Sequence, residues 1–308
     1  MSDSILTVTN LSKCYGTAYA LRNCSFSVRR GQICGLIGAN GAGKTTLMRL
    51  ICGQSSPTEG TVSLFGSKNK KELIENRRRI GCMIETPILY PDFSAEKNLM
   101  IYGMKKGLPV KDEIGSILKT VGLANVGNKH FSKYSLGMKE RMGIALALLG
   151  EPEFLILDEP MNGLDPVGVA EIRDLILRLN RERNITVLLS SHILKELSLI
   201  ATDYIFIDKG EFISQMSAEE LNSKCRQSFL VKVSDTKKAC TVLENVLQIK
   251  DYLVLNDNSV RIFKITDHPE MIVRELVEND IDVFSASEEG QDLEQFYIEL
   301  VKGGINNA

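Results

Sequence analysis

The glycine-rich stretch G-A-N-G-A-G-K-T-T at residues 38–46 constrains the fold more than any other part of the chain. It follows the apolar run Q-I-C-G-L-I-G (32–38), which is typical of a buried strand, and it opens K-T-T-L-M-R-L-I-C, which has helical apolar spacing. The pattern G-x-x-x-x-G-K-[ST] between a strand and a helix predicts a phosphate-binding loop. A chance glycine-rich turn is the alternative, and the flanking strand and helix argue against it.

The chemistry of this loop follows from its residue types. Glycines let backbone N–H groups converge on phosphate oxygens, and the positive end of the helix dipole adds to the attraction. Lys44 is expected to reach the β- and γ-phosphates, and Thr45 is expected to offer its hydroxyl to Mg²⁺. The predicted nucleotide-binding residues here are Gly38, Ala39, Asn40, Gly41, Ala42, Gly43, Lys44, Thr45 and Thr46.

The first two thirds of the chain alternates between strand-like and helix-like segments. The near-continuous apolar runs at 32–38, 154–158, 185–191 and 204–208 are typical of parallel strands covered on both faces, which predicts an α/β sheet. The segments S-I-L-T-V-T-N-L-S-K and G-T-V-S-L-F-G are expected to add antiparallel strands. Residues 86–150 read as mostly helical, so we interpret them as a helical subdomain inserted between two strands.

The length of 308 residues favours two domains, which we place at 1–216 and 217–308. The second segment is acidic and shows no catalytic constellation. Its order β-α-β-β-α-β plus a last helix predicts a small α+β, ferredoxin-like domain.

Composition excludes several classes of protein. Hydrophobic content of 44% and charged content of 25% are those of an ordinary soluble protein. No apolar run approaches the roughly 18–20 residues that span a bilayer, and the N-terminus lacks the features of a secretory signal. The seven cysteines include no C-x-x-C pair, and no basic-aromatic pattern indicates nucleic acid. We therefore expect a protein kept in the cytoplasm, without a nucleic-acid partner.

The stretch F-L-I-L-D-E-P places two carboxylates at the end of an apolar strand. Asp158 is expected to hold the Mg²⁺ shell, and Glu159 is placed to polarise an attacking water as a general base. An Asp-Glu pair that merely caps a loop is the alternative. The phosphate-binding loop upstream favours the catalytic interpretation.

A third stretch, K-Y-S-L-G-M-K-E-R-M-G-I-A-L-A-L-L-G-E-P, reads as a capped helix. Ser135 is expected to cap its start, and Gly150 with Pro152 is expected to end it. Taken alone it is an ordinary helix, but it lies shortly before the Asp-Glu strand.

Together these stretches make residues 4–216 resemble the ATP-binding cassette (ABC) ATPases. The order is specific: phosphate-binding loop, helical insertion, signature helix, Asp-Glu strand, G-L-D-P, then a histidine. The resemblance implies ATP and Mg²⁺ as cofactors. It also implies a homodimer in which Ser135 and Gly137 contact the γ-phosphate of ATP bound to the other subunit. Kinases and GTPases share the loop but not this series.

The resemblance assigns three further residues. Asp165, in N-G-L-D-P, would cross the dimer interface, and His192 would hold the γ-phosphate as a catalytic residue. Tyr15, in L-S-K-C-Y-G, stands where the family stacks an aromatic ring on adenine. Helix capping by His192 and simple packing of Tyr15 are the alternatives.

Two departures from the family pattern bear on activity. The signature reads Y-S-L-G-M where the family commonly has L-S-G-G-Q, so Leu136 and Met138 are unusual. Glu85 stands where the family usually has a glutamine. An ionised glutamate only accepts hydrogen bonds, and it repels a γ-phosphate by roughly 4 kcal/mol per charge pair at 4 Å and an effective dielectric constant of 20. We therefore expect Glu85 to act through the metal or its water, and a surface carboxylate before a turn is the alternative.

Glu85 in its I-E-T-P setting, with the appended domain, is similar to the bacitracin-resistance and lantibiotic-immunity branch of these ATPases. That similarity implies an ATPase, peripheral on the cytoplasmic face of the membrane, that powers export of antimicrobial peptides through separate multi-spanning permease subunits. The alternatives are a soluble ABC ATPase acting on ribosomes or DNA, and a nucleotide-sensing module with weak turnover.

Overall fold

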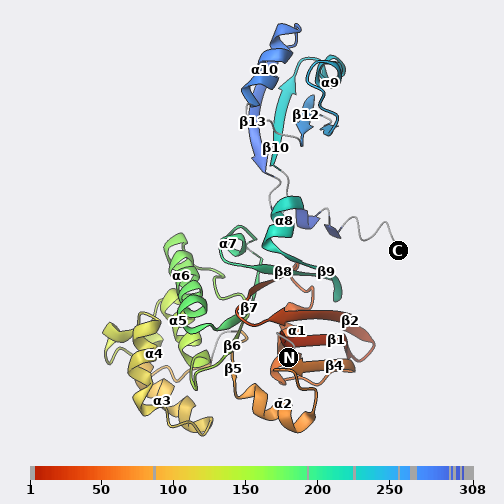
Figure 1. Ribbon diagram of the computed structural model, residues 1–308. Helices are drawn as coiled ribbons and strands as arrows, with labels where there is room; N and C mark the ends of the chain where they lie inside the picture. The colour runs from red at the N-terminus through yellow and green to blue at the C-terminus, as the bar shows by residue number, and fades with distance from the viewer. Residues whose placement is uncertain are drawn as a thin grey trace. The chain divides into compact units, whose positions relative to one another are not determined.

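The computed structural model (Figure 1) describes residues 4–85, 88–192, 194–224, 227–255, 257–263, 269–290, 293, 296–298 and 300–301. The chain forms two compact units, the first running to Ala218 and the second beginning at Glu219.

The described part of the first unit contains a nine-stranded sheet in the order β4-β1-β2-β9-β8-β3-β7-β6-β5. Its strands are β1 (Ser4–Tyr15), β2 (Ala18–Arg29), β3 (Ile33–Ile37), β4 (Glu59–Leu64), β5 (Ile80–Met83), β6 (Phe154–Leu157), β7 (Thr186–Ser191), β8 (Asp203–Asp208) and β9 (Glu211–Ser217). The pairs β3–β7, β3–β8, β5–β6 and β6–β7 are parallel, while β1–β2 and β1–β4 are antiparallel. The predicted parallel runs and antiparallel additions are confirmed, whereas β2 and β9 were not predicted.

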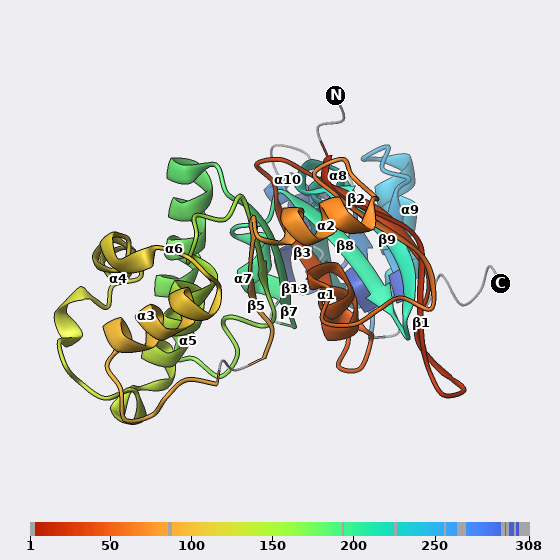
Figure 2. The same ribbon diagram turned by 90° about the horizontal axis from the view of Figure 1, so that it is seen from below.

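Helices cover this sheet and form a lobe beside it. They are α1 (Lys44–Cys52), α2 (Lys70–Arg77), α3 (Ala95–Lys105), α4 (Ile114–Thr120), α5 (Leu136–Ala147), α6 (Pro166–Arg183) and α7 (Leu194–Ser198). Figure 2 shows α3, α4 and α5 together on the side of the unit away from β1 and β2. These three helices fall within residues 86–150, where the sequence predicts a helical subdomain; Thr86 and Pro87 lie outside the described residues.

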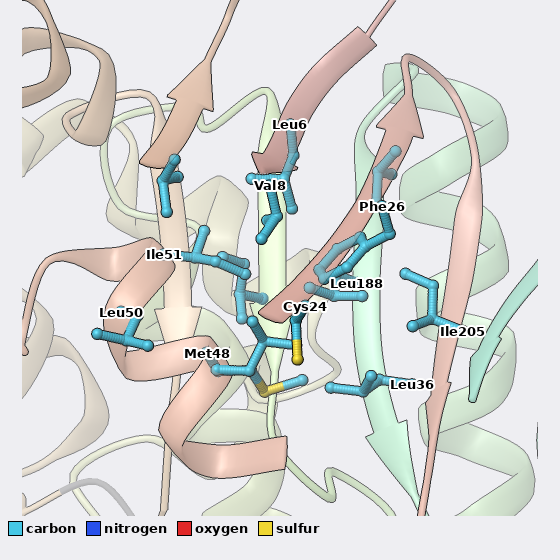
Figure 3. Packing of buried hydrophobic residues seen from close by; sticks show 14 of the residues in the cluster. Leu6, Val8, Cys24, Phe26, Leu36, Met48, Leu50, Ile51, Leu188 and Ile205 are labelled. Carbon is cyan, nitrogen blue, oxygen red and sulfur yellow. The ribbon is translucent and has the colours of Figure 1, made fainter. Parts of the chain in front are cut away.

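The core of the first unit fixes α1 against the sheet. Met48 and Ile51 on the inner face of α1 are 0% exposed, and they pack with Val8, Phe26 and Leu188 from β1, β2 and β7 (Figure 3). Burial of an aliphatic or aromatic side chain stabilises a fold by about 1.5–3 kcal/mol. This packing therefore holds the N-terminus of α1 at the end of β3.

Strand direction then determines where the chemistry-bearing residues lie. Parallel strands end at the same edge of a sheet, and ligands of α/β proteins bind beyond that edge. The phosphate-binding loop follows β3, His192 follows β7, Asp158 follows β6 and Glu85 lies just beyond β5. Because these four strands are neighbours in the order β3-β7-β6-β5, segments far apart in sequence meet at one edge.

The second unit has its own sheet and core. After α8 (Ala218–Lys224) its order is β10 (Gln227–Val233), α9 (Thr236–Asn245), β11 (Tyr252–Val254), β12 (Ser259–Ile262), α10 (Pro269–Glu278) and β13 (Val283–Gly290). The sheet runs β11-β12-β10-β13 with antiparallel pairs, and its core includes Val231, Leu243, Val260 and Leu276. This is the element order expected from the sequence, and the ferredoxin-like class stays a prediction. The last predicted helix, 292–303, lies partly outside the described residues.

The contact of β5 with α5 gives a test of the fold. A Cβ atom added to Gly81 would lie 2.0 Å from the carbonyl oxygen of Ala147 and 2.7 Å from Leu155. We expect Gly81→Ala to lower the free energy of unfolding by about 1–3 kcal/mol, the usual cost of overpacking a core. Gly115→Ala is the matched control, because nothing lies within 4 Å of that position in α4 and the change favours a helix. Denaturant unfolding measures both, and equal stability of the two variants would contradict this packing.

Candidate functional site

The phosphate-binding loop has a backbone that only glycine adopts readily. Gly41 and Gly43 have φ of 80° and 101°, in the left-handed region where other residues are strained. A Cβ atom on Gly43 would lie 2.6 Å from the carbonyl oxygen of Ala20. The loop borders a cavity of about 220 Å³ lined by Ala20, residues 40–46 and Glu159.

Lys44 supplies the positive charge of this cavity. Its side chain is 6% exposed, and its ammonium group donates to the carbonyl oxygens of Gly38 (2.7 Å) and Ala39 (3.2 Å). The same nitrogen lies 3.5 Å from a carboxylate oxygen of Glu159. Because the first turn of α1 carries no acidic residue, the lysine and the helix N-terminus together favour an anion.

Both carboxylate oxygens of Asp158 accept hydrogen bonds from hydroxyl groups. Thr45 Oγ1 donates to Oδ2 at 2.7 Å, and Ser190 Oγ donates to Oδ1 at 2.6 Å. Its backbone N–H donates to the carbonyl oxygen of Met83 at 2.8 Å, which ties the end of β6 to the end of β5. A hydroxyl and a carboxylate are hard oxygen ligands of the kind that Mg²⁺ prefers, so Thr45 and Asp158 fit the predicted metal role.

Glu159 adopts a conformation that a glutamate rarely takes. Its φ is 51°, and such left-handed backbone costs on the order of 1–3 kcal/mol and gathers at functional sites. Its N–H donates to Ser190 Oγ at 2.8 Å, and its carbonyl oxygen accepts from the N–H of Asn162 at 3.0 Å. Its carboxylate forms an ion pair with Lys44 and a hydrogen bond with Nδ1 of His192. The structure thus brings together Lys44, Glu159 and His192, which the sequence assigned to one site.

Glu85 lies beside this site with its charge already paired. Arg49 Nη2, on α1, lies 2.5 Å from Oε1 of Glu85, and the Glu85 side chain is 64% exposed. Glu85 lines a cavity of about 360 Å³, whose other lining residues are Leu136, Glu140, Asp158, Glu159 and Asn162. Within the described residues, no group of three or more His, Cys, Asp or Glu side chains is close enough to hold a metal ion. The metal and catalytic roles of Glu85 therefore stay predictions.

The residues predicted to reach a second subunit sit at helix starts. Ser135 caps α5 by accepting from the N–H of Met138 at 3.4 Å, and Asp165 caps α6 by accepting from Gly168 at 3.0 Å. A Cβ atom on Gly137 would lie 3.8 Å from Leu164. The start of α5 thus packs beside the loop that contains Asp165. The capping by Ser135 is confirmed, and the contacts across a dimer stay predictions.

Tyr15 stands at the end of β1, and the residue is 51% exposed. The ammonium group of Lys13 lies 4.9 Å from the ring centroid, within the range of a cation–π interaction. An exposed ring can stack on a base, and its contact with adenine stays a prediction.

Sequence reasoning missed two residues of this site. Ser190 forms hydrogen bonds with both Asp158 and Glu159. The sequence feature that could have indicated it is a polar residue within the otherwise apolar strand-like run at 185–191. Arg49 pairs with Glu85 across 36 positions of sequence, and no local pattern indicates that contact.

The chain is similar to known proteins over nearly its whole length. The family model described as "ABC transporter" matches residues 21–162. The bacitracin transport ATP-binding protein BcrA of Bacillus licheniformis is 39% identical over 304 residues, which is 98% of this chain and 98% of that protein. The lantibiotic transport ATP-binding protein SrtF of Streptococcus pyogenes is 39% identical over 210 residues, covering 68% of this chain and 89% of that protein.

Two solved structures resemble most of the chain. CbiO1 from Clostridium perfringens, described as part of the transporter complex cbiONQ, has a TM-score of 0.65 and 27% identity, covering 80% of this chain and 97% of that chain. The cassette MJ0796, solved as a dimer bound to ADP and phosphate, has a TM-score of 0.61 and 25% identity, covering 69% and 98%. No helix in the described part of this chain is long and apolar enough to cross a membrane.

Glu140 gives a test of the cavity beside Glu85. Burial raises the pKa of its carboxyl from the ordinary 4.5 to about 7. The folded chain then binds more protons than the unfolded chain between these values, so stability falls as pH rises through that window. Glu140→Gln removes the cost of burying an ionised carboxylate. We therefore expect the thermal unfolding midpoint of this variant to exceed the parent's at pH 8 and to match it near pH 4.5. Glu182→Gln, at an exposed position of α6, is the control. A Glu140→Gln difference that is the same at both pH values would contradict the burial.

Proposed function

The chain belongs to the ABC transporter family of ATP-binding proteins, and we propose that it hydrolyses ATP to drive export of antimicrobial peptides through a membrane permease. One observation carries the proposal. The carboxylate of Glu159 faces Lys44 and His192 and lies next in sequence to Asp158, which is bonded to Thr45. A carboxylate, two nitrogen donors and a metal-compatible pair of oxygens thus meet beside the glycine-rich loop, which is the set that phosphoryl transfer requires.

Each residue has a role that follows from its chemistry. The backbone of residues 38–46 and the ammonium group of Lys44 would hold the phosphates of ATP. Thr45 and Asp158 would hold Mg²⁺, which neutralises charge on the phosphate oxygens when bound. Glu159 would accept a proton from the attacking water. His192, whose side chain is 42% exposed and bonded to Glu159, would contact the γ-phosphate.

We infer that two copies of the chain complete each ATP site. Ser135 and Gly137 lie at the start of α5, and Asp165 lies at the start of α6. A helix N-terminus favours anions, so the start of α5 in a second copy would suit the γ-phosphate. The MJ0796 cassette, solved as a dimer, supports this arrangement.

The membrane partner and the substrate rest on the relatives. The names of BcrA and SrtF describe transport of bacitracin and of lantibiotics, and they favour this function over a soluble ATPase or a nucleotide sensor. We place the chain on the cytoplasmic face of the membrane, bound to separate multi-spanning subunits.

Glu159→Gln tests the catalytic role and the dimer together. The amide cannot accept a proton from water, so hydrolysis should fall by about 10²–10⁴-fold, the usual contribution of a general base. With hydrolysis blocked, ATP should hold two copies together. Phosphate release and the mass in solution with and without Mg-ATP measure these effects. Glu153→Gln, in which the changed carboxylate pairs with Arg30 and Arg79 before β6, is the control. If the Glu159→Gln chain stays monomeric with ATP, the proposal that two copies complete each ATP site is wrong.

Glu85→Ala tests the predicted coupling role. Removal of this carboxylate should weaken ATP hydrolysis by the complex with its membrane partner more than it weakens ATP binding by the isolated chain, because Glu85 lies beside the phosphate loop and not in it. Turnover of the complex and nucleotide affinity are measured in parallel. Glu75→Ala removes an exposed carboxylate that pairs with Arg78 on its own segment, and it should change neither. Full activity of the Glu85→Ala complex would leave that residue without the role assigned to it.

A further inference from the structure

Ser190 is a fully buried polar residue in the middle of the site. It lies on β7, two positions before His192, and is 0% exposed. Its hydroxyl donates to Asp158 Oδ1 at 2.6 Å and accepts from the backbone N–H of Glu159 at 2.8 Å. One side-chain atom on a neighbouring strand therefore touches both residues of the Asp-Glu pair.

The direction of both hydrogen bonds is determined by the partners. A backbone N–H can only donate, and an ionised carboxylate can only accept. Ser190 Oγ must therefore accept the hydrogen bond from the N–H of Glu159. Its single proton is then donated to the carboxylate of Asp158. A hydroxyl makes both bonds from one atom, whereas an aliphatic side chain makes neither. Loss of the hydroxyl would leave the N–H of Glu159 and Oδ1 of Asp158 without this partner, which is unfavourable, more so for the charged group.

The first bond orients the carboxylate of Asp158. With Oδ1 held by Ser190, the other oxygen, Oδ2, faces Thr45 at 2.7 Å. Thr45 belongs to the phosphate loop and Ser190 belongs to β7, so the plane of the carboxylate is held from two sides. The oxygen that faces the loop is the one available to a metal ion there.

The second bond holds the backbone of Glu159. The left-handed φ of 51° at this glutamate is held on one side by Ser190 and on the other by Asn162, whose N–H donates to the Glu159 carbonyl oxygen at 3.0 Å. Without the Ser190 bond, the peptide could relax toward ordinary φ values. The carboxylate of Glu159 would then turn away from Lys44 and His192.

We propose that Ser190 is a positioning residue that aligns the metal-binding carboxylate of Asp158 and the water-activating carboxylate of Glu159 as one unit, a role that rests on the proposed function. A single hydroxyl sets the plane of one carboxylate and the backbone conformation of the next residue. The metal shell and the general base are thereby placed relative to each other by a residue of β7, in addition to the loop that carries them.

The test compares Ser190→Ala with Ser190→Thr, which keeps the hydroxyl. Binding of a fluorescent ATP analogue is measured without Mg²⁺ and across a Mg²⁺ titration, and steady-state hydrolysis is measured with saturating ATP. In Ser190→Ala we expect the affinity without Mg²⁺ to stay within about twofold. The Mg²⁺ concentration for half-maximal effect should rise, and kcat should fall, each by about 10–100-fold, as for other partners of metal ligands. Ser190→Thr should restore both toward the parent values.

Thr186→Val is the matched control at the other end of β7. Thr186 is 1% exposed, and its hydroxyl accepts from the N–H of Gly31 at 3.0 Å. This variant removes a buried bond of the same kind from the same strand, away from the strand's site end. A merely structural role for Ser190 predicts that both variants lower the unfolding midpoint and neither shifts the Mg²⁺ requirement.

An unchanged Mg²⁺ requirement in Ser190→Ala overturns the inference, whatever happens to stability. If the extra methyl group of Ser190→Thr prevents folding, the comparison of Ser190→Ala with Thr186→Val still tests the positioning role of Ser190. Failure of the proposed function is a separate result. In that case the parent chain itself, with its membrane partner, would bind ATP without hydrolysing it, whereas the Mg²⁺ titration of binding would still report on Ser190.

Discussion

The parallel pairing of β3, β7, β6 and β5 is the constraint on which the site depends. Four neighbouring strands end at one edge, and each is followed by a residue of the site. The backbone bond from Asp158 N–H to Met83 and the side-chain bond from Thr45 to Asp158 join three of these strand ends into one network. Because β3, β6 and β7 are buried on both faces, their apolar packing stabilises an arrangement that keeps these charged groups close together.

The parts of this arrangement that could be predicted are those with a local cause. The loop at 38–46 needs glycine for left-handed backbone, and the apolar runs need cover on both faces, so both can be predicted from the sequence alone. The capping of α5 by Ser135 likewise follows from residue type. β2 was missed because its buried side chains are interleaved with polar ones, and its pairing with β1 is a contact between two irregular strands with several register shifts.

The parts that could not be predicted are contacts between distant segments. The prediction for Glu85 weighed its charge against a γ-phosphate alone, and the structure adds Arg49 at 2.5 Å. A guanidinium so close offsets the repulsion that motivated the metal role, although an exposed pair of this kind contributes little to stability. The carboxylate of Glu85 is therefore shared between α1 and the cavity it lines with Asp158 and Glu159. Arg49 and Glu85 are 36 positions apart in the sequence, so no local pattern indicates their contact.

Backbone conformation gives a final link between fold and chemistry. Glu85 and Glu159 both have left-handed φ values, 63° and 51°, and both lie just beyond the end of a parallel strand. A glutamate has no short polar side chain to stabilise that conformation, as asparagine and aspartate do, so the surrounding contacts must supply the free energy. At Glu159 these contacts are the bonds of its N–H and carbonyl oxygen to Ser190 and Asn162. Glycine at this position would adopt the same backbone without strain but would remove the carboxylate. The strained backbone is therefore better explained by the role of the Glu159 carboxylate than by the needs of the turn.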